Sequence, residues 1–118
     1  MDNSYFVHKG WLVKRSKYLG KWRKRYATVT STYLSTYKID NINEQPTEMI
    51  PLKYCSFPRS CEEKMKKFNS FYIKHKDETF YFQADTQEEK QQWVTALQNV
   101  ISCRRKSANS EQSIRNDL

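Results

Sequence analysis

The sequence predicts an α+β domain, mainly β, in which seven short antiparallel strands form a small barrel or sandwich capped by one C-terminal amphipathic helix. In the first two thirds of the chain, short runs of aromatic and β-branched residues alternate with polar turns, which is typical of strands. The period then changes, because Trp93, Leu97, Val100 and Ile101 fall on one helical face. At 118 residues the chain has the size of one domain, and the helix can cover an open end of the barrel.

Strand composition is found in seven segments, which are residues 5–15, 22–31, 33–39, 48–53, 54–57, 68–75 and 79–84. Gly20, in the polar segment between the first two strands, marks a hairpin loop over residues 16–21. Residues 40–47 and the charged residues 58–67 have loop composition, and Pro51 interrupts the fourth strand.

The predicted helix spans residues 86–103, and Thr86 and Glu89 have the spacing of a capping box at its start. Residues 104–118 are polar, rich in Ser and Asn, and without periodicity. We expect them to be a disordered tail or the start of a linker, so the predicted domain spans residues 5–103.

Several function classes are disfavoured by composition. Cys55, Cys61 and Cys103 are odd in number and irregular in spacing, which favours a reducing, cytosolic setting over a disulfide framework. No zinc-ligand pairs accompany them, and His8 and His75 are isolated, so we expect neither a metal nor a cofactor. There is no secretory signal pattern, no long apolar run, and no nucleophile with a base and an orienting group, so we expect no enzymatic activity.

The most informative feature is a basic hairpin. Between Lys9 and Arg25 lie eight of the chain's 21 Lys and Arg residues and no acidic residue. The other 13 basic residues equal the 13 Asp and Glu in number, so the net charge of +8 sits in this stretch. Aromatic and aliphatic residues alternate with these charges, which indicates a folded segment that presents positive charge to an anionic partner.

Strand alternation predicts which of these charges converge. If Leu12 and Ala27 point into the core, then Lys14, Arg23 and Arg25 lie on the same side, at the open end of the barrel and beneath the hairpin loop. Arg grips phosphate through parallel donors, and Lys acts as a point charge that sits between two phosphates. The site therefore suits a multiply phosphorylated small head group.

The surrounding residues have less specific roles. Loop amides and the Ser16 hydroxyl supply further donors to an anion. Lys17, Lys21 and Lys53 fit either the pocket or an anionic membrane leaflet. Arg15 points to the other face, where its charge attracts such a leaflet. The apolar pair Tyr18 and Leu19, at the loop tip, either packs within the loop or dips into a membrane interface.

Two motifs at opposite ends of the chain carry a family resemblance. The run Lys9-Gly10-Trp11-Leu12-Val13-Lys14-Arg15, followed by Trp22-Arg23-Lys24-Arg25-Tyr26, resembles the first hairpin of a pleckstrin homology (PH) domain. The run Thr79-Phe80-Tyr81-Phe82-Gln83-Ala84-Asp85, followed by Trp93, is similar to the last strand and helix of that family. The resemblance covers residues 6–101 and implies the seven-stranded PH fold and a non-catalytic binding role.

Within the family, the pattern Lys14-x-Ser16 followed by Arg23-x-Arg25 resembles the members that bind 3-phosphoinositides, and the hairpin is most similar to that of the protein kinase B PH domain. This resemblance implies that Lys14 bridges the 3- and 4-phosphates, that Arg25 holds the 3-phosphate and that Arg23 assists.

Three residues depart from the protein kinase B pattern. Lys17 replaces an acidic residue, which is expected to strengthen binding and to relax selectivity toward bisphosphates without a 3-phosphate. Lys53 replaces an asparagine and adds charge, whereas Glu78 replaces an arginine and removes a phosphate contact. A phosphate-contacting tyrosine of the third strand aligns with Thr36 or Tyr37, and the two alternatives stay open.

The sequence thus predicts a cytoplasmic module that is recruited to the inner leaflet of the plasma membrane by phosphatidylinositol 3,4,5-trisphosphate and the 3,4-bisphosphate, with soluble inositol phosphates as further ligands. The alternative is a PH domain that binds proteins and has weak or promiscuous phosphoinositide binding, including the 4,5-bisphosphate. Nucleic acid is disfavoured, because the charge is confined to one hairpin. The candidate head-group residues are Lys14, Arg15, Ser16, Lys17, Lys21, Arg23, Arg25, Tyr37 and Lys53.

Overall fold

The structure is a computed structural model that describes residues 5–116, with side chains described for residues 5–106. Over this range the chain forms seven strands and two helices. These are β1 (His8–Arg15), β2 (Trp22–Val29), β3 (Tyr33–Tyr37), β4 (Glu48–Pro51), β5 (Arg59–Ser60), α1 (Glu62–Met65), β6 (Ser70–His75), β7 (Glu78–Gln83) and α2 (Gln87–Asn116). The predicted fold class is confirmed.

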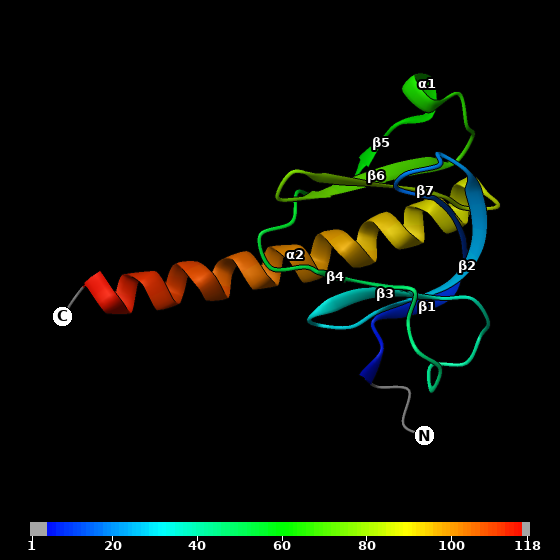
Figure 1. The fold of residues 1–118 in the computed structure, drawn as a ribbon. Helices are drawn as coiled ribbons and strands as arrows, with labels where there is room; N and C mark the ends of the chain where they lie inside the picture. The colour runs from blue at the N-terminus through cyan, green and yellow to red at the C-terminus, as the bar shows by residue number, and fades with distance from the viewer. Residues whose placement is uncertain (1–4, 117–118) are drawn as a thin grey trace.

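All seven strands belong to one antiparallel sheet in the order β4-β3-β2-β1-β7-β6-β5. β1 pairs with β2 along its whole length, but with β7 only at Val13 and Lys14. The two halves of the sheet therefore diverge away from this point, and α2 runs between them (Figure 1). The end of β1 that pairs with β7 also leads into the hairpin loop, and the basic residues gather there.

The core lies between the bent sheet and α2. The four apolar residues that predicted the helix are all buried, with Trp93 2% exposed and Leu97 fully buried. They pack with strand residues from both halves of the sheet, among them Leu12, Val29, Leu34, Phe71, Ile73 and Phe82. The predicted cap is also confirmed, because the Glu89 amide donates to Thr86 Oγ1 at 3.0 Å.

The prediction is wrong about the fifth strand. Residues 54–57 are not a strand, because Tyr54 adopts a left-handed backbone (φ 68°) that interrupts the extended chain after β4. Strand pairing resumes at β5, inside the segment predicted to be a loop, and the single turn α1 follows it. β4 and β5 are the two edge strands, which is consistent with the tolerance of Pro51 in β4.

The predicted end of the helix is also wrong. α2 continues past Cys103 to Asn116, and its last turns project beyond the sheet (Figure 1). Residues 117–118 of the predicted tail lie outside the described residues. No Gly or Pro lies in residues 104–116 to end the helix. Arg105 also anchors the extension, since it donates to the Cys55 carbonyl at 2.8 Å and lies 4.0 Å from the Phe57 ring centroid. In the described chain, no helix is both long and apolar enough to span a bilayer.

The three cysteines are expected to differ in reactivity. Cys55 and Cys61 are buried, and this burial raises the pKa of both thiols, that of Cys55 to about 11, whereas Cys103 is exposed. Because the thiolate is the reactive form, one thiol in three is expected to react rapidly with Ellman's reagent near neutral pH, and all three after denaturation. Fast reaction of two or more thiols in the native protein would contradict this packing.

Candidate functional site: the basic hairpin pocket

A concave pocket of about 140 Å³ lies at the hairpin end of the sheet. The residues that line it are Lys14, Ser16, Lys17, Arg23, Arg25, Thr47 and Glu48. The first five come from the β1–β2 hairpin and were predicted from the sequence, whereas the last two come from the start of β4 and the loop before it. Four cationic side chains therefore share one small space.

Strand register explains this convergence. Lys14 pairs with Arg23, and Leu12 pairs with Arg25. Residues directly opposite one another in an antiparallel pair project from the same face. Since Leu12 is buried in the core, at 2% exposed, the three cations follow it onto the inner face of the bent sheet. The predicted alternation of the hairpin is confirmed.

The hairpin loop is held in an arch by its own hydrogen bonds. The Ser16 amide donates to the Lys21 carbonyl at 2.7 Å, and the Lys21 amide donates to Ser16 Oγ at 3.0 Å. Gly20 closes the loop in a left-handed conformation (φ 65°), and a Cβ there would lie 2.8 Å from Arg15 Nη2. The Ser16 hydroxyl accepts one bond in this arch, and its own proton can be donated to an anion in the pocket.

The cations differ in how they are held. The Lys14 side chain is only 13% exposed, and its Nζ lies 5.8 Å from the centroid of the Phe80 ring. Arg25 uses Nη1 to donate to the Lys24 carbonyl at 2.9 Å, and the guanidinium has four further N–H donors. Arg23 is exposed at the mouth. A partly buried lysine with two arginines can hold several phosphate groups at once.

Glu48 is the residue that the sequence analysis missed. Its Oε1 lies 2.6 Å from Lys14 Nζ, and both side chains are largely covered. The carboxylate therefore neutralises a largely covered cation of the pocket. Strand alternation could have found Glu48, because it shares a face of β4 with Ile50, which is 1% exposed and in the core.

Neither of the two alternatives for a phosphate-contacting residue in β3 lines the pocket. Tyr37 is buried, at 9% exposed, so its candidate role is not supported by its position. Thr36 is 1% exposed, and its Oγ1 lies 2.7 Å from Oγ1 of Thr47, which does line the pocket. Thr36 thus contacts a residue that lines the pocket without lining the pocket itself, because residues 34–37 of β3 are all buried.

Lys17 and Glu78 are paired in the structure. Lys17 Nζ lies 3.0 Å from Glu78 Oε1, and this hydrogen bond raises the pKa of Lys17. Both side chains are substantially exposed. In the sequence, Lys17 and Glu78 were interpreted as two independent departures from the protein kinase B pattern. Lys17 was expected to strengthen ligand binding, and Glu78 to remove a phosphate contact. The structure shows that they act on each other, because the β6–β7 turn carries Glu78 to the hairpin loop.

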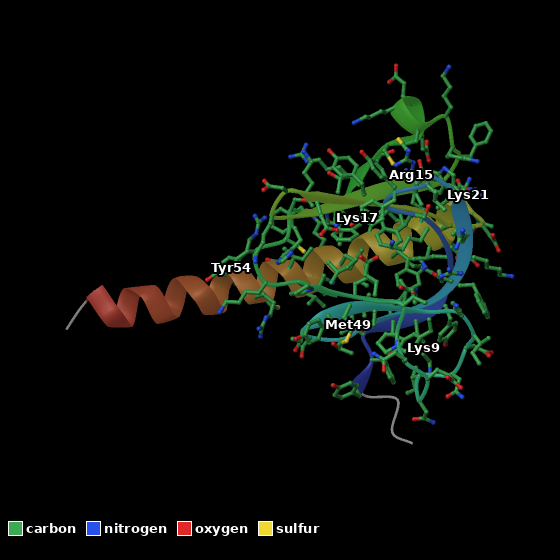
Figure 2. All side chains as sticks on the ribbon, in the orientation of Figure 1. Lys9, Arg15, Lys17, Lys21, Met49 and Tyr54 are labelled. Carbon is green, nitrogen blue, oxygen red and sulfur yellow. The ribbon has the colours of Figure 1, made fainter. Side chains whose placement is uncertain are left out.

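The other three predicted residues lie outside the pocket. Arg15 points to the outer face, with its guanidinium carbon 5.8 Å from the Tyr81 ring centroid. Lys21 contributes its backbone to the loop arch, and Figure 2 places it with Arg15 at the hairpin end of the molecule. Lys53 lies over the ring of Tyr54 at 5.4 Å, beyond β4. None of the three lines the pocket.

Removing the Glu78 charge is expected to release Lys17 toward the pocket. Glu78→Gln should tighten binding of soluble inositol 1,3,4,5-tetrakisphosphate about twofold to fivefold, a small gain because exposed ion pairs contribute about 0.2–1 kcal/mol. Isothermal titration calorimetry measures it. Asp77→Asn, with the same charge change in the same exposed turn, is the control. Equal affinities in the two variants would show that the pairing does not affect the pocket.

The fold and the pocket define a small, β-rich module with a cationic pocket. The chain belongs to the PH domain family, because the PH domain family model matches residues 6–102. It is 30% identical to pleckstrin from Canis lupus familiaris over 98 residues, which cover 82% of this chain and 28% of pleckstrin.

Solved structures agree with this assignment. A solution structure of a pleckstrin homology domain matches with a TM-score of 0.72 and 30% identity, covering 81% of this chain and 85% of that one. The C-terminal PH domain of pleckstrin in complex with D-myo-Ins(1,2,3,4,5)P5 matches with a TM-score of 0.68 and 26% identity, covering 80% and 97%. The matched region of this chain is accordingly a non-catalytic module.

Proposed function

We propose that the hairpin pocket binds the phosphorylated inositol head group of membrane phosphoinositides and thereby recruits its protein from the cytoplasm to the plasma membrane. The observation that carries this proposal is the convergence of Lys14, Arg23 and Arg25 with Ser16 and Lys17 on one cavity. Charge-assisted hydrogen bonds each contribute about 1.5–3 kcal/mol, so a few of them suffice for micromolar binding. Soluble inositol phosphates present the same groups and are expected to bind there too.

The preferred ligands in this proposal carry a 3-phosphate, as in phosphatidylinositol 3,4,5-trisphosphate and the 3,4-bisphosphate. Support comes from the pattern Lys14-x-Ser16 with Arg23-x-Arg25, and from the positions of these side chains around one cavity. Lys14 would sit between the 3- and 4-phosphates, while Arg25 grips the 3-phosphate and Arg23 assists from the mouth. The complex of the related pleckstrin domain with an inositol pentakisphosphate supports the ligand class.

A second candidate function is protein binding with weak or promiscuous lipid binding. The observation that favours it is that two lysines of the pocket already form ion pairs, Lys14 with Glu48 and Lys17 with Glu78. Both ion pairs must be exchanged for contacts to phosphate when a head group binds. This exchange lowers the affinity of the pocket relative to one that contains the same cations alone.

Quantitative sedimentation with liposomes separates the two functions. Liposomes that contain phosphatidylserine are compared with liposomes that also contain the 3,4,5-trisphosphate, the 3,4-bisphosphate or the 4,5-bisphosphate. The proposal predicts the tightest binding to the two lipids that carry a 3-phosphate. Weak and equal binding to all three phosphoinositides would favour the second candidate, and no gain over phosphatidylserine alone would contradict a head-group site.

A further inference from the structure

Three large apolar side chains are exposed on two loops at the hairpin end of the sheet. Tyr18 and Leu19, at the hairpin tip, are 88% and 67% exposed, and Phe68, between α1 and β6, is 84% exposed. One exposed apolar residue is ordinary in a folded protein. Here, three such residues lie at the end of the sheet that carries the proposed head-group pocket, so their location calls for a physical explanation.

The segment from Lys64 to Phe68 lies beside the hairpin. Lys67 Nζ is 5.4 Å from the centroid of the Trp22 ring, at the start of β2. Gln83 Nε2 donates to the Phe68 carbonyl at 3.0 Å, and Gln83 pairs with Val13 of β1. Figure 1 likewise shows α1 and the loop after it at the end of the sheet where β1 connects to β2. The two loops therefore approach a common surface together.

The turn that carries Phe68 is fixed by hydrogen bonds. Lys66 and Asn69 have left-handed backbones, with φ of 55° and 58°. The Asn69 amide donates to Glu62 Oε1 at 2.9 Å, and Ser70 Oγ donates to the Lys67 carbonyl at 2.8 Å. Phe68 is thus held outward by an ordered turn, which lowers the entropy that its insertion into another phase would cost.

The charges around these side chains complement an anionic bilayer. Lys64 and Lys66 are exposed on the α1 segment, and Lys17 and Lys21 flank the hairpin tip. Lysines near an anionic leaflet each contribute about 1 kcal/mol, and aromatic side chains are favoured at its interface. The apolar side chains are separate tips rather than one continuous patch, so they suit a fluid interface better than a protein groove.

We propose that the segment Lys64–Phe68 is a second membrane-contacting element, in which Phe68 enters the interface of an anionic bilayer beside Tyr18 and Leu19 while the lysines contact lipid head groups. The inference rests on the proposed function, because head-group binding in the pocket brings this end of the domain to the bilayer. It assigns a role to a basic segment whose sequence indicates only loop composition.

The test compares vesicles with the soluble head group. Phe68→Asn is expected to weaken binding to vesicles of phosphatidylserine and phosphatidylinositol 3,4,5-trisphosphate about fivefold to tenfold, because the burial of an aromatic side chain is lost. Its affinity for inositol 1,3,4,5-tetrakisphosphate should equal that of the wild type, since the side chain lies outside the pocket. The double variant Lys64→Ala/Lys66→Ala should show the same pattern, with a loss that shrinks at high salt.

Tyr54→Asn is the matched control. Tyr54 is also an exposed aromatic residue beside a lysine, but Figure 2 shows it toward the opposite end of the molecule. It should bind both ligands as the wild type does. Equal vesicle binding by the wild type and Phe68→Asn would overturn the inference while leaving the pocket intact. Failure of the wild type to bind either ligand would overturn the proposed function and the inference with it.

Discussion

Replacing Arg25 with Ala is expected to weaken binding of inositol 1,3,4,5-tetrakisphosphate about thirtyfold to a hundredfold, which corresponds to about 2–3 kcal/mol. The guanidinium lines the pocket with one N–H used by the Lys24 carbonyl, so at least one parallel pair of donors can grip a phosphate. Since the side-chain hydrogen bond of Arg25 is local and exposed, the variant should fold normally. Calorimetry measures the affinity, and circular dichroism checks the fold.

Lys24→Ala is the control for this variant. It removes the same charge from the neighbouring position of β2, but Lys24 lies on the other face, with Nζ 5.0 Å from the Trp11 ring centroid. Its affinity for the soluble head group should stay close to that of the wild type. The affinity of Arg25→Lys should lie between those of Arg25→Ala and Lys24→Ala, because lysine keeps the charge but lacks the planar set of parallel N–H donors. Equal losses in Arg25→Ala and Lys24→Ala would mean that net charge, and not the pocket, attracts the ligand.

Glu48→Gln is expected to tighten binding of the same head group about fivefold to thirtyfold, which corresponds to about 1–2 kcal/mol. The variant removes the carboxylate that pairs with Lys14 at 2.6 Å, and the side chain keeps its size. A phosphate then meets an uncompensated ammonium group and no longer meets a neighbouring negative charge. The gain is larger than for Glu78→Gln because the Lys14–Glu48 pair is less exposed than the Lys17–Glu78 pair.

The same substitution is expected to lower the stability of the unliganded protein, by about 1 kcal/mol in urea denaturation, since Lys14 loses its partner in a largely covered site. Opposite signs in binding and stability are the specific signature of a carboxylate that competes with the ligand. Glu44→Gln, in the exposed loop before β4, is the matched control and should change neither quantity. Weaker binding by Glu48→Gln would instead make Glu48 an acceptor for an inositol hydroxyl.

Local sequence patterns predicted the part of the site that lies within one hairpin. Lys14, Arg23 and Arg25 could be placed on one face, because strand alternation needs only the identity of a buried neighbour such as Leu12. Strand alternation could also have placed Glu48 on the inner face of β4. It could not have predicted the ion pairs of Glu48 with Lys14 and of Glu78 with Lys17. They join the hairpin to segments that lie far away in sequence, and their geometry depends on how the sheet bends around α2.

For the fold as well, features with a local sequence signal were predicted, and features that depend on distant contacts were not. Long periodic segments such as the buried face of α2 were predicted correctly, because many residues carry the signal. The predicted end of that helix was wrong, since Arg105 is held by the Cys55 carbonyl and the Phe57 ring, which are distant in the sequence. The fifth strand was misplaced because it consists of two residues, and the left-handed conformation of Tyr54 has no local signal.

The most direct test of the central claim is to map backbone amide chemical shifts by NMR during titration with inositol 1,3,4,5-tetrakisphosphate. If the ligand occupies the hairpin pocket, the largest changes will fall on Ser16, Lys17, the β2 residues from Arg23 to Arg25, and Thr47 with Glu48. Small changes are expected in the Lys64–Phe68 segment, because the soluble head group has no bilayer to bring it into contact. Largest changes outside the pocket, or no changes at all, would contradict the claim that this pocket binds inositol phosphates.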